Sequence, residues 1–364
     1  MRRDPALLAL EDGRVFRGTA AGARGTAFGE VVFNTAMAGY QETLTDPSYR
    51  GQIVVMTASH VGNYGLAKDD AESDRIQVSG FCARAFSDRF SNPRGEEALL
   101  PALGRAGVVA IDGVDTRALV RHLRSLGAMR GAVSTEHASE AEAAALVAAI
   151  REQPRMEGAA LGLSAGTAEA YRFGEPGGPR VAVLDYGVKR NILRKLAARG
   201  LSGTVFPAAA TAGEVAAAGP WDGFFLSNGP GDPAALPACV GTIRDLLATG
   251  RPLFGICLGH QLLGLALGAR TFKLKFGHRG VNHPVRDVAT GAVSITSQNH
   301  GFAVDLATLP DGLALTHVNL NDGTCEGFRL EGRPVFAVQY HPESAPGPHD
   351  SDALFAEFAS SLGR

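Results

Sequence analysis

The sequence predicts an α/β protein of two domains, in which the second domain has a mainly parallel central sheet flanked by helices. Its length of 364 residues suits two domains of ordinary size. In the second half, continuous apolar runs such as Val181–Asp185 and Phe224–Ser227 alternate with helical patterns, which is typical of βαβ units on a parallel sheet. A Gly- and Pro-rich stretch, Phe173–Pro179, separates this half from a first half of different character.

The first half is predicted to mix strands and helices with polar loops. Apolar runs predict strands over residues 7–16, 29–33, 53–56 and 108–111. Asp115 is a candidate N-cap for a helix whose apolar positions recur at helical spacing as far as Leu126. The Ala- and Glu-rich segment from Ser139 to Ile150 should also be helical.

In the second half, strands over residues 181–185, 224–227 and 254–256 are each followed by a loop and a helix. Meander strands are expected over residues 293–297, 314–318, 327–330 and 335–339, before a last helix over residues 352–362. We therefore place the first domain at residues 1–150, a linker at 151–179 and the second domain at 180–364.

Composition excludes several classes of function. The 35 Lys and Arg residues against 37 Asp and Glu give a net charge of −2, so nothing favours binding to nucleic acid or to an anionic membrane. The four cysteines contain no CxxC pair, so we expect no metal site and no disulfide scaffold. The apolar run Ala6–Leu10 is too short for a signal peptide, and no run is long enough to span a membrane. We expect a soluble, cytoplasmic protein with reduced thiols.

One cysteine stands in a setting that favours reactivity. The segment from Gly255 to Gly259 has the form G-x-C-x-G around Cys257, between a short apolar strand and a helix start. This is the thiol version of a nucleophile elbow, in which the reacting side chain sits on a strained strand-to-helix turn. The dipole of the following helix would favour the thiolate. The alternative is a buried cysteine that acts as a small hydrophobic residue.

A cysteine nucleophile needs a base that a third group holds in place. The best candidate is His341, which follows the predicted strand at residues 335–339. Pro342 restricts the backbone, so that Glu343 can fold back and orient the imidazole. The alternative for His341 is a surface histidine before a turn.

The loop Ser227–Pro233 also lies at the end of a predicted strand. Its two glycines, Gly229 and Gly231, let backbone N–H groups approach a ligand, and the loop could stabilise an oxyanion together with the N–H of Leu258. An ordinary Gly/Pro turn is an equally good interpretation of this loop alone. A nucleotide phosphate loop fits less well, because no G-x-x-x-x-G-K-[ST] motif is present.

Taken together, the loop Ser227–Pro233, the elbow and His341–Glu343 resemble a class I, triad-type glutamine amidotransferase. The segment Val32–Tyr49 resembles the N-terminal domain of the carbamoyl-phosphate synthetase small subunit. Four further segments carry the same resemblance, which covers nearly the whole chain: residues 59–65, 111–117, 185–191 and 297–302. The resemblance implies an N-terminal α/β small-subunit domain that faces a partner and a C-terminal amidotransferase domain.

The resemblance also assigns roles to residues. It implies that Cys257 attacks the side-chain amide of L-glutamine, that His341 is the base and that Glu343 orients it. Residues implied to bind glutamine are Ser48, Gly229, Gly231, Leu258, Gln261, Asn299, Gly301 and Phe302. Structural alternatives stay open for three of them: Phe302 as a core residue, Asn299 as a turn residue, and Ser48 as a cap or turn residue after Pro47.

The resemblance further implies a partner. Ammonia released near pH 7 becomes mostly ammonium, which is not nucleophilic, and the family passes ammonia through an internal tunnel to a large subunit. That subunit makes carbamoyl phosphate from bicarbonate and ATP, for arginine and pyrimidine synthesis. We therefore expect a heterodimer that assembles further, with no cofactor in this chain and with ATP and Mg on the large subunit. The alternatives are a γ-glutamyl hydrolase or peptidase on the same fold, and a catalytically silent binding module.

Overall fold

The computed structural model describes residues 4–137 and 139–363, and the chain separates into two compact units. The first unit is Met1–Met156 and the second is Glu157–Arg364. Most of the segment for which we predicted a linker, residues 151–179, falls in the second unit, where it forms helix α5 (Gly162–Ala165) and strand β10 (Tyr171–Phe173). None of the helices among the described residues is both long and apolar enough to cross a membrane.

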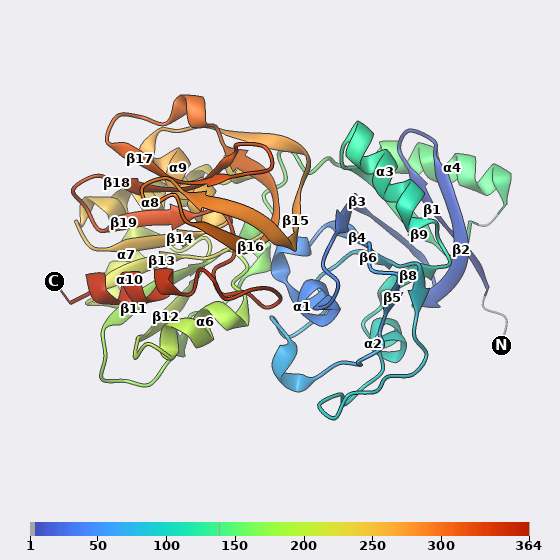
Figure 1. The fold of residues 1–364 in the computed structure, drawn as a ribbon, viewed down its shortest axis with the longest axis horizontal. Coiled ribbons are helices and arrows are strands. Elements are labelled where there is room, and N and C mark those ends of the chain that lie inside the picture. Colours follow the sequence, from blue (N-terminus) through green and yellow to red (C-terminus); the bar gives the residue numbers. More distant parts are fainter. Residues whose placement is uncertain (1–3, 138, 364) are drawn as a thin grey trace. The chain divides into compact units, whose positions relative to one another are not determined.

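The first unit is built on a closed barrel (Figure 1). Its strands, in their order around the barrel, are β1 (Pro5–Leu10), β2 (Val15–Gly22), β8 (Val109–Asp112), β6 (Gly80–Cys82), β4 (Gln52–Met56), β3 (Thr26–Asn34) and β9 (Met129–Ser134). The first and last of these close the ring as an antiparallel pair, with Leu7 opposite Ser134. A turn at Gly13, which has φ of 96°, divides the stretch predicted over residues 7–16 into β1 and β2.

Helices and short segments complete the first unit. They are α1 (Tyr40–Thr45), the 3-10 turns η1 (Pro47–Tyr49) and η2 (Lys68–Asp70), α2 (Leu99–Arg105), α3 (Thr116–Leu126), α4 (Glu140–Arg151), and the strand pair β5 (His60–Val61) and β7 (Ala85–Phe86). The predicted N-cap is confirmed, since Asp115 accepts a hydrogen bond from the Ala118 N–H at 2.9 Å. Helix α4 begins with a capping box in which Ser139 and Glu142 each accept from the other's backbone N–H.

The second unit contains a mixed sheet of ten strands. In order across the sheet they are β10, β12 (Ser202–Pro207), β11 (Arg180–Asp185), β13 (Gly223–Leu226), β14 (Leu253–Ile256), β19 (Val335–Val338), β18 (Cys325–Leu330), β17 (Leu313–Asn319), β15 (Thr271–Asp287) and β16 (Val293–Val304). The pairs from β12 to β19 are parallel, and those from β19 to β16 are antiparallel. The last strand of the chain, β19, therefore lies inside the sheet, between β14 and β18. The meander predicted for these strands is present, since β17, β18 and β19 pair antiparallel in sequence order, and β19 in addition pairs in parallel with β14.

Both faces of the parallel part are covered, which explains why its strands are apolar throughout. In β11, Ala182 and Leu184 pack into one hydrophobic core, whereas Val181 and Val183 pack into the other. The elements that accompany the sheet are α6 (Arg190–Ala197), α7 (Ala212–Ala217), η3 (Pro233–Ala235), α8 (Pro237–Ala248), α9 (Leu258–Leu267), η4 (Leu306–Thr308) and α10 (Ala353–Ser361). The carboxyl ends of β11, β13, β14 and β19 lie at one edge of the sheet, where sites form in such folds.

Candidate active site

Cys257 occupies a strained turn between β14 and α9. Its φ of 54° lies in the left-handed region, which residues other than glycine rarely adopt. The two flanking glycines are required by close packing: a Cβ on Gly259 would lie 2.3 Å from the carbonyl oxygen of Leu226, and one on Gly255 would lie 2.9 Å from Gly259. Because α9 begins at Leu258, the positive end of its dipole lies at the cysteine. The backbone therefore has the geometry expected of a nucleophile elbow.

The loop after β13 packs against this elbow. The carbonyl oxygen of Ser227 accepts a hydrogen bond from the Gly259 N–H at 3.0 Å. A Cβ on Gly229 would lie 2.1 Å from the carbonyl oxygen of Tyr186, and Gly231 has φ of 96°. Both positions thus require glycine, and the loop backbone is held beside the first turn of α9. Its ability to donate to an oxyanion stays a prediction.

His341 follows β19 and is buried beside the cysteine's strand. Its backbone N–H donates to the Ser297 carbonyl oxygen at 2.9 Å, and its Nδ1 lies 2.7 Å from Oε1 of Glu343. Burial by itself lowers the pKa of His341, but the charges of Glu343 and of the nearby Cys257 sulfur outweigh burial and raise the pKa to about 10. The buried Nε2 has no hydrogen-bond partner among the described residues. The imidazole is thus oriented at one nitrogen by the carboxylate and leaves the other available for proton transfer.

Glu343 has a second cationic partner, which the sequence analysis did not assign. Nζ of Lys189 donates to Oε1 of Glu343 at 2.8 Å and to the carbonyl oxygen of Ser344 at 2.6 Å. Burial alone would raise the pKa of Glu343, but Lys189 and His341 lower it to about 2. Asn191 donates to the carbonyl oxygen of Glu343 at 2.5 Å, and Asn228 accepts from the Lys189 N–H at 3.1 Å. The carboxylate therefore stays ionised in a fully buried position.

A signal for Lys189 was present in the sequence. The polar residues 185–191 directly follow the buried strand β11, whose carboxyl end neighbours that of β13. Parallel strand ends converge at one edge, so a lysine there could have been expected to meet the triad.

Most residues predicted to bind glutamine lie around the elbow. Gln261 stands on α9 and donates through Nε2 to the Phe302 carbonyl oxygen at 2.8 Å. Asn299, Gly301 and Phe302 are on β16, and the thiol of Cys257 donates to the Asn299 carbonyl oxygen at 3.6 Å. Ser48 belongs to the first unit, where it is buried in η1 and its N–H donates to Asp46 at 2.8 Å. The binding roles themselves remain predictions.

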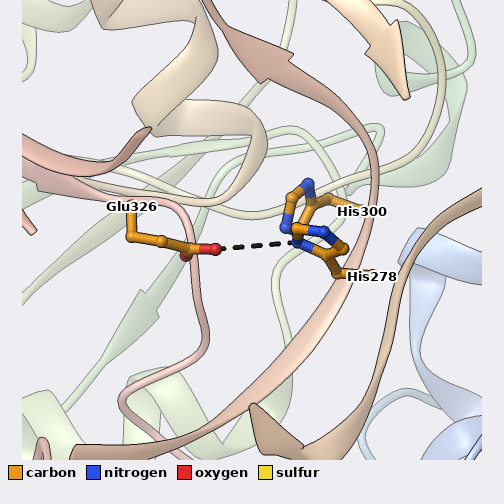
Figure 2. Close-up of side chains that lie close together, drawn as sticks. All are labelled: His278, His300 and Glu326. Atoms are coloured by element: carbon orange, nitrogen blue, oxygen red, sulfur yellow. Dashed lines mark ion pairs between the residues drawn. The ribbon is translucent and has the colours of Figure 1, made fainter. Parts of the chain in front are cut away.

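Another buried group has the residue types of a metal site (Figure 2). His278, His300 and Glu326 each offer one ligand atom, and these atoms lie within 4.8 Å of one another. However, the nitrogens and oxygens of the group already have partners within the protein. His278 Nε2 lies 2.8 Å from Asp322, and His300 Nε2 lies 2.9 Å from Oε1 of Gln298. These contacts favour a hydrogen-bonded polar network over a cation site.

Together the parallel sheet, the elbow at Cys257 and the histidine after β19 have the features of one class of protein, the class I glutamine amidotransferases. The model for that family, described as glutamine amidotransferase class-I, matches residues 182–361. A second model, described as carbamoyl-phosphate synthase small chain, CPSase domain, matches residues 8–133. The chain belongs to the carbamoyl phosphate synthase small chain family.

Curated relatives agree over the whole length. The carbamoyl phosphate synthase small chain of Chlorobaculum tepidum is 52% identical over 100% of this chain and 99% of the relative. That of Akkermansia muciniphila is 52% identical over 97% of this chain and 96% of the relative, and that of Streptomyces coelicolor is 51% identical over 98% and 96%. The predicted family, fold class and role as a glutamine-hydrolysing enzyme subunit are thereby confirmed, and nothing favours the alternative hydrolase or a silent module.

Proposed function

We propose that this chain hydrolyses L-glutamine through Cys257, His341 and Glu343. The observation that carries the proposal is the position of His341: one nitrogen is held at 2.7 Å by Glu343, and the pKa of the ring responds to the Cys257 sulfur. An imidazole whose pKa is raised can hold the proton of a nearby nucleophile, which is what a thioester-forming site needs from its base.

The first half of the reaction forms a thioester. The Cys257 thiolate attacks the side-chain amide carbon of glutamine, and the amide oxygen takes up the negative charge. Backbone N–H groups of Leu258 and of the Gly229 region stabilise this oxyanion. The imidazolium of His341 gives its proton to the departing nitrogen, the carbon–nitrogen bond breaks, and ammonia leaves.

The second half restores the enzyme. His341, now neutral, takes a proton from water, and the resulting hydroxide attacks the thioester carbon. The carbon–sulfur bond breaks, glutamate is released and Cys257 returns to its thiolate. Glu343, kept ionised by Lys189, stabilises the imidazolium and holds the ring in place in both halves. We assign substrate binding to Gly231, Gln261, Asn299, Gly301 and Phe302, and also to Ser48.

The released ammonia is used by a partner. The description of the relatives as small chains implies a large subunit and no cofactor of this chain's own. The large subunit binds ATP and Mg and makes carbamoyl phosphate from bicarbonate, for arginine and pyrimidine synthesis. The two chains form a cytoplasmic heterodimer that assembles further. Purification of the native protein should yield the heterodimer with a larger chain, and recovery of a stable, isolated small chain would contradict this part of the proposal.

The decisive experiment replaces Cys257 with serine in the complex with the large subunit. Cys257→Ser should lower glutamine-dependent synthesis by about 10³-fold or more, because the weaker nucleophile cannot form the thioester. Synthesis from added ammonia should be unchanged. Cys239→Ser is the matched control, since Cys239 is also buried but lies in α8, where its thiol donates to the Ala208 carbonyl oxygen. Loss of both activities in Cys257→Ser, or full glutamine-dependent activity, would contradict the assignment.

A further inference from the structure

Glu326 is a fully buried carboxylate to which the reaction above gives no role. It lies in β18, and no lysine or arginine pairs with it among the described contacts. Its Oε1 accepts a hydrogen bond from Nδ2 of Asn319 at 2.7 Å, and its Oε2 accepts from Nε2 of Gln298 at 2.9 Å. His278 Nδ1 lies 3.7 Å from Oε1 (Figure 2). Burying a carboxylate is strongly unfavourable unless hydrogen bonds or charges compensate, so this arrangement requires an explanation.

A continuous series of hydrogen bonds connects Glu326 with the glutamine pocket. Gln298, which donates to Glu326, places its Oε1 2.9 Å from Nε2 of His300. On the other side of the ring, Nδ1 of His300 donates to the Phe302 carbonyl oxygen at 2.7 Å. That same carbonyl oxygen accepts from Nε2 of Gln261 at 2.8 Å. Gln298, His300 and Phe302 alternate along β16, so they share one face of the strand.

The segment that these bonds hold also borders the nucleophile. Asn299, between Gln298 and His300, provides the carbonyl oxygen that accepts from the Cys257 thiol at 3.6 Å. Ser297, which precedes Gln298, accepts a hydrogen bond through its carbonyl oxygen from the backbone N–H of His341 at 2.9 Å. A change in the path of β16 between residues 297 and 302 would therefore displace the pocket and the contacts of both reacting side chains.

Glu326 holds the outer end of the series, because it accepts hydrogen bonds from both Asn319 and Gln298. Burial, with the nearby charge of His278, lowers the pKa of His300 well below its usual value, so the ring is neutral and carries one N–H. The Phe302 carbonyl oxygen takes that N–H, and Nε2 then needs a donor. The side-chain amide of Gln298 lies between this ring nitrogen and Glu326. Because Glu326 accepts one N–H of that amide, it sets how the Gln298 side chain faces His300.

We propose that Glu326 is a positioning residue for glutamine binding, which acts through Gln298 and His300 to fix the backbone at Phe302 and the side chain of Gln261. The proposal rests on the proposed glutaminase function, because it concerns the pocket of that reaction. It assigns no chemical step to Glu326. Its effect belongs to the affinity for glutamine, whereas the thioester chemistry belongs to Cys257 and His341.

The experiment compares two substitutions of Glu326 in the complex with the large subunit. Glu326→Leu removes the acceptor of Asn319 and one of the two acceptors of the Gln298 amide, the other being Thr296, and we expect the KM for glutamine to rise by about 10-fold or more. Glu326→Gln can accept from Asn319 and donate to a turned Gln298 amide, so it should raise KM by at most about threefold. Glu331→Leu, at an exposed glutamate just beyond β18, is the matched control and should leave KM unchanged.

KM separates positioning from a merely structural role, because partial unfolding lowers the active fraction and hence the apparent kcat but leaves KM unchanged. If Glu326→Leu does not fold, Gln298→Met breaks the same series one step closer to the pocket and should raise KM similarly. A folded Glu326→Leu or Gln298→Met protein with KM within about twofold of the native value would overturn the proposal, as would equal impairment by leucine and glutamine at position 326.

Failure of the proposed function would show elsewhere. It would appear as retained glutamine-dependent activity in Cys257→Ser. That result does not affect the comparison of the glutamine KM between Glu326→Leu and the native protein. Titration of glutamine into Cys257→Ser and into the double variant with Glu326→Leu provides a second, non-catalytic readout. The double variant should bind about 10-fold more weakly, and equal affinities would contradict the role of Glu326.

Discussion

The parallel and antiparallel parts of the second unit's sheet contribute to the site in different ways. In the parallel part, each functional side chain lies in the loop directly after a strand: Lys189 after β11, Cys257 after β14 and His341 after β19. In the antiparallel part, Gln298 and Glu326 lie within the strands themselves, in β16 and β18. The first part carries the residues of the proposed triad and Lys189, and the second part carries the polar network that borders them.

The difference shows which kind of site can be recognised in a sequence. Carboxyl ends of parallel strands meet at one edge whatever the details of pairing, so a short motif after each strand is sufficient to predict convergence. Side chains within antiparallel strands meet only in one register. Between β15 and β16 that register shifts twice, between Lys273 and His278 and again between Gly280 and His283. Three experiments test how far the distinction holds.

The largest effect is expected at Lys189. Lys189→Met would leave the buried Glu343 carboxylate with His341 as its remaining charged partner, and loss of one member of a buried ion pair is expected to lower the free energy of unfolding by about 3–5 kcal/mol. Glutamine hydrolysis should fall as well, because Glu343 no longer holds the imidazole in one place. Urea unfolding and steady-state kinetics measure the two effects.

Lys195→Met is the matched control, because Lys195 lies in the following helix and pairs with the partly exposed Asp352 at 2.7 Å. That pair is expected to contribute only about 0–1 kcal/mol. Equal losses in the two variants would show that the strand-end lysine has no special place in the site.

The next effect is the response to acid. The pKa of Glu343 is about 2 in the folded protein against an ordinary value of 4.5, so its ion pairs stabilise the fold fully above about pH 4.5 and are lost as the pH falls towards 2. At 1.36 kcal/mol per pKa unit, the difference corresponds to about 3 kcal/mol. Denaturant unfolding of the native protein and of Glu343→Gln should therefore give stabilities that converge as the pH is lowered from about 5 to about 3.

The stabilisation that comes from His341 changes with pH in the opposite direction. The raised pKa of His341, about 10 against 6.5, stabilises the fold below pH 6.5, and this contribution disappears as the pH rises through 10. If the free energies of unfolding of the native protein and of Glu343→Gln differ by the same amount at neutral and at acid pH, that result would contradict the ion-paired state of the triad.

The smallest effect is expected at the outer end of the antiparallel network. Burial lowers the pKa of His278, but Asp322 and Glu326 raise it to about 9. Because Asp322 is partly exposed, Asp322→Asn should change the free energy of unfolding by less than about 1 kcal/mol and leave the glutamine KM within about twofold. The pKa of His278, followed by NMR titration, should fall. A KM increase as large as that predicted for Glu326→Leu would show that Asp322 also helps to position the glutamine pocket.

Much of the fold and of the proposed triad was accessible from the sequence. The cap at Asp115, the helix from Ser139 and the elbow at Cys257 each depend on neighbouring residues, and local chemistry was sufficient to predict them. The exact ends of β1 and β2 were harder to predict, because apolar residues stand on both sides of the four-residue turn that contains Gly13.

The closed barrel and the polar network depend on distant pairings. Leu7 meets Ser134 only after the chain has passed through five other strands of the barrel, and no local pattern encodes that contact. Glu326 gave no signal either: a single glutamate in a short strand is ordinary, and its burial follows from how β18 lies between β17 and β19.

The place of β19 in the sheet has a consequence for biosynthesis. This strand is made after both β14 and β18, yet it separates them in the sheet and carries the chain to His341. Until it is inserted, β14 presents an open edge and the elbow has no base. With the proposed triad, a nascent or truncated chain that ends before Val335 lacks its base and cannot hydrolyse glutamine, so glutamine is spared until β19 and His341 have been synthesised and folded into the sheet.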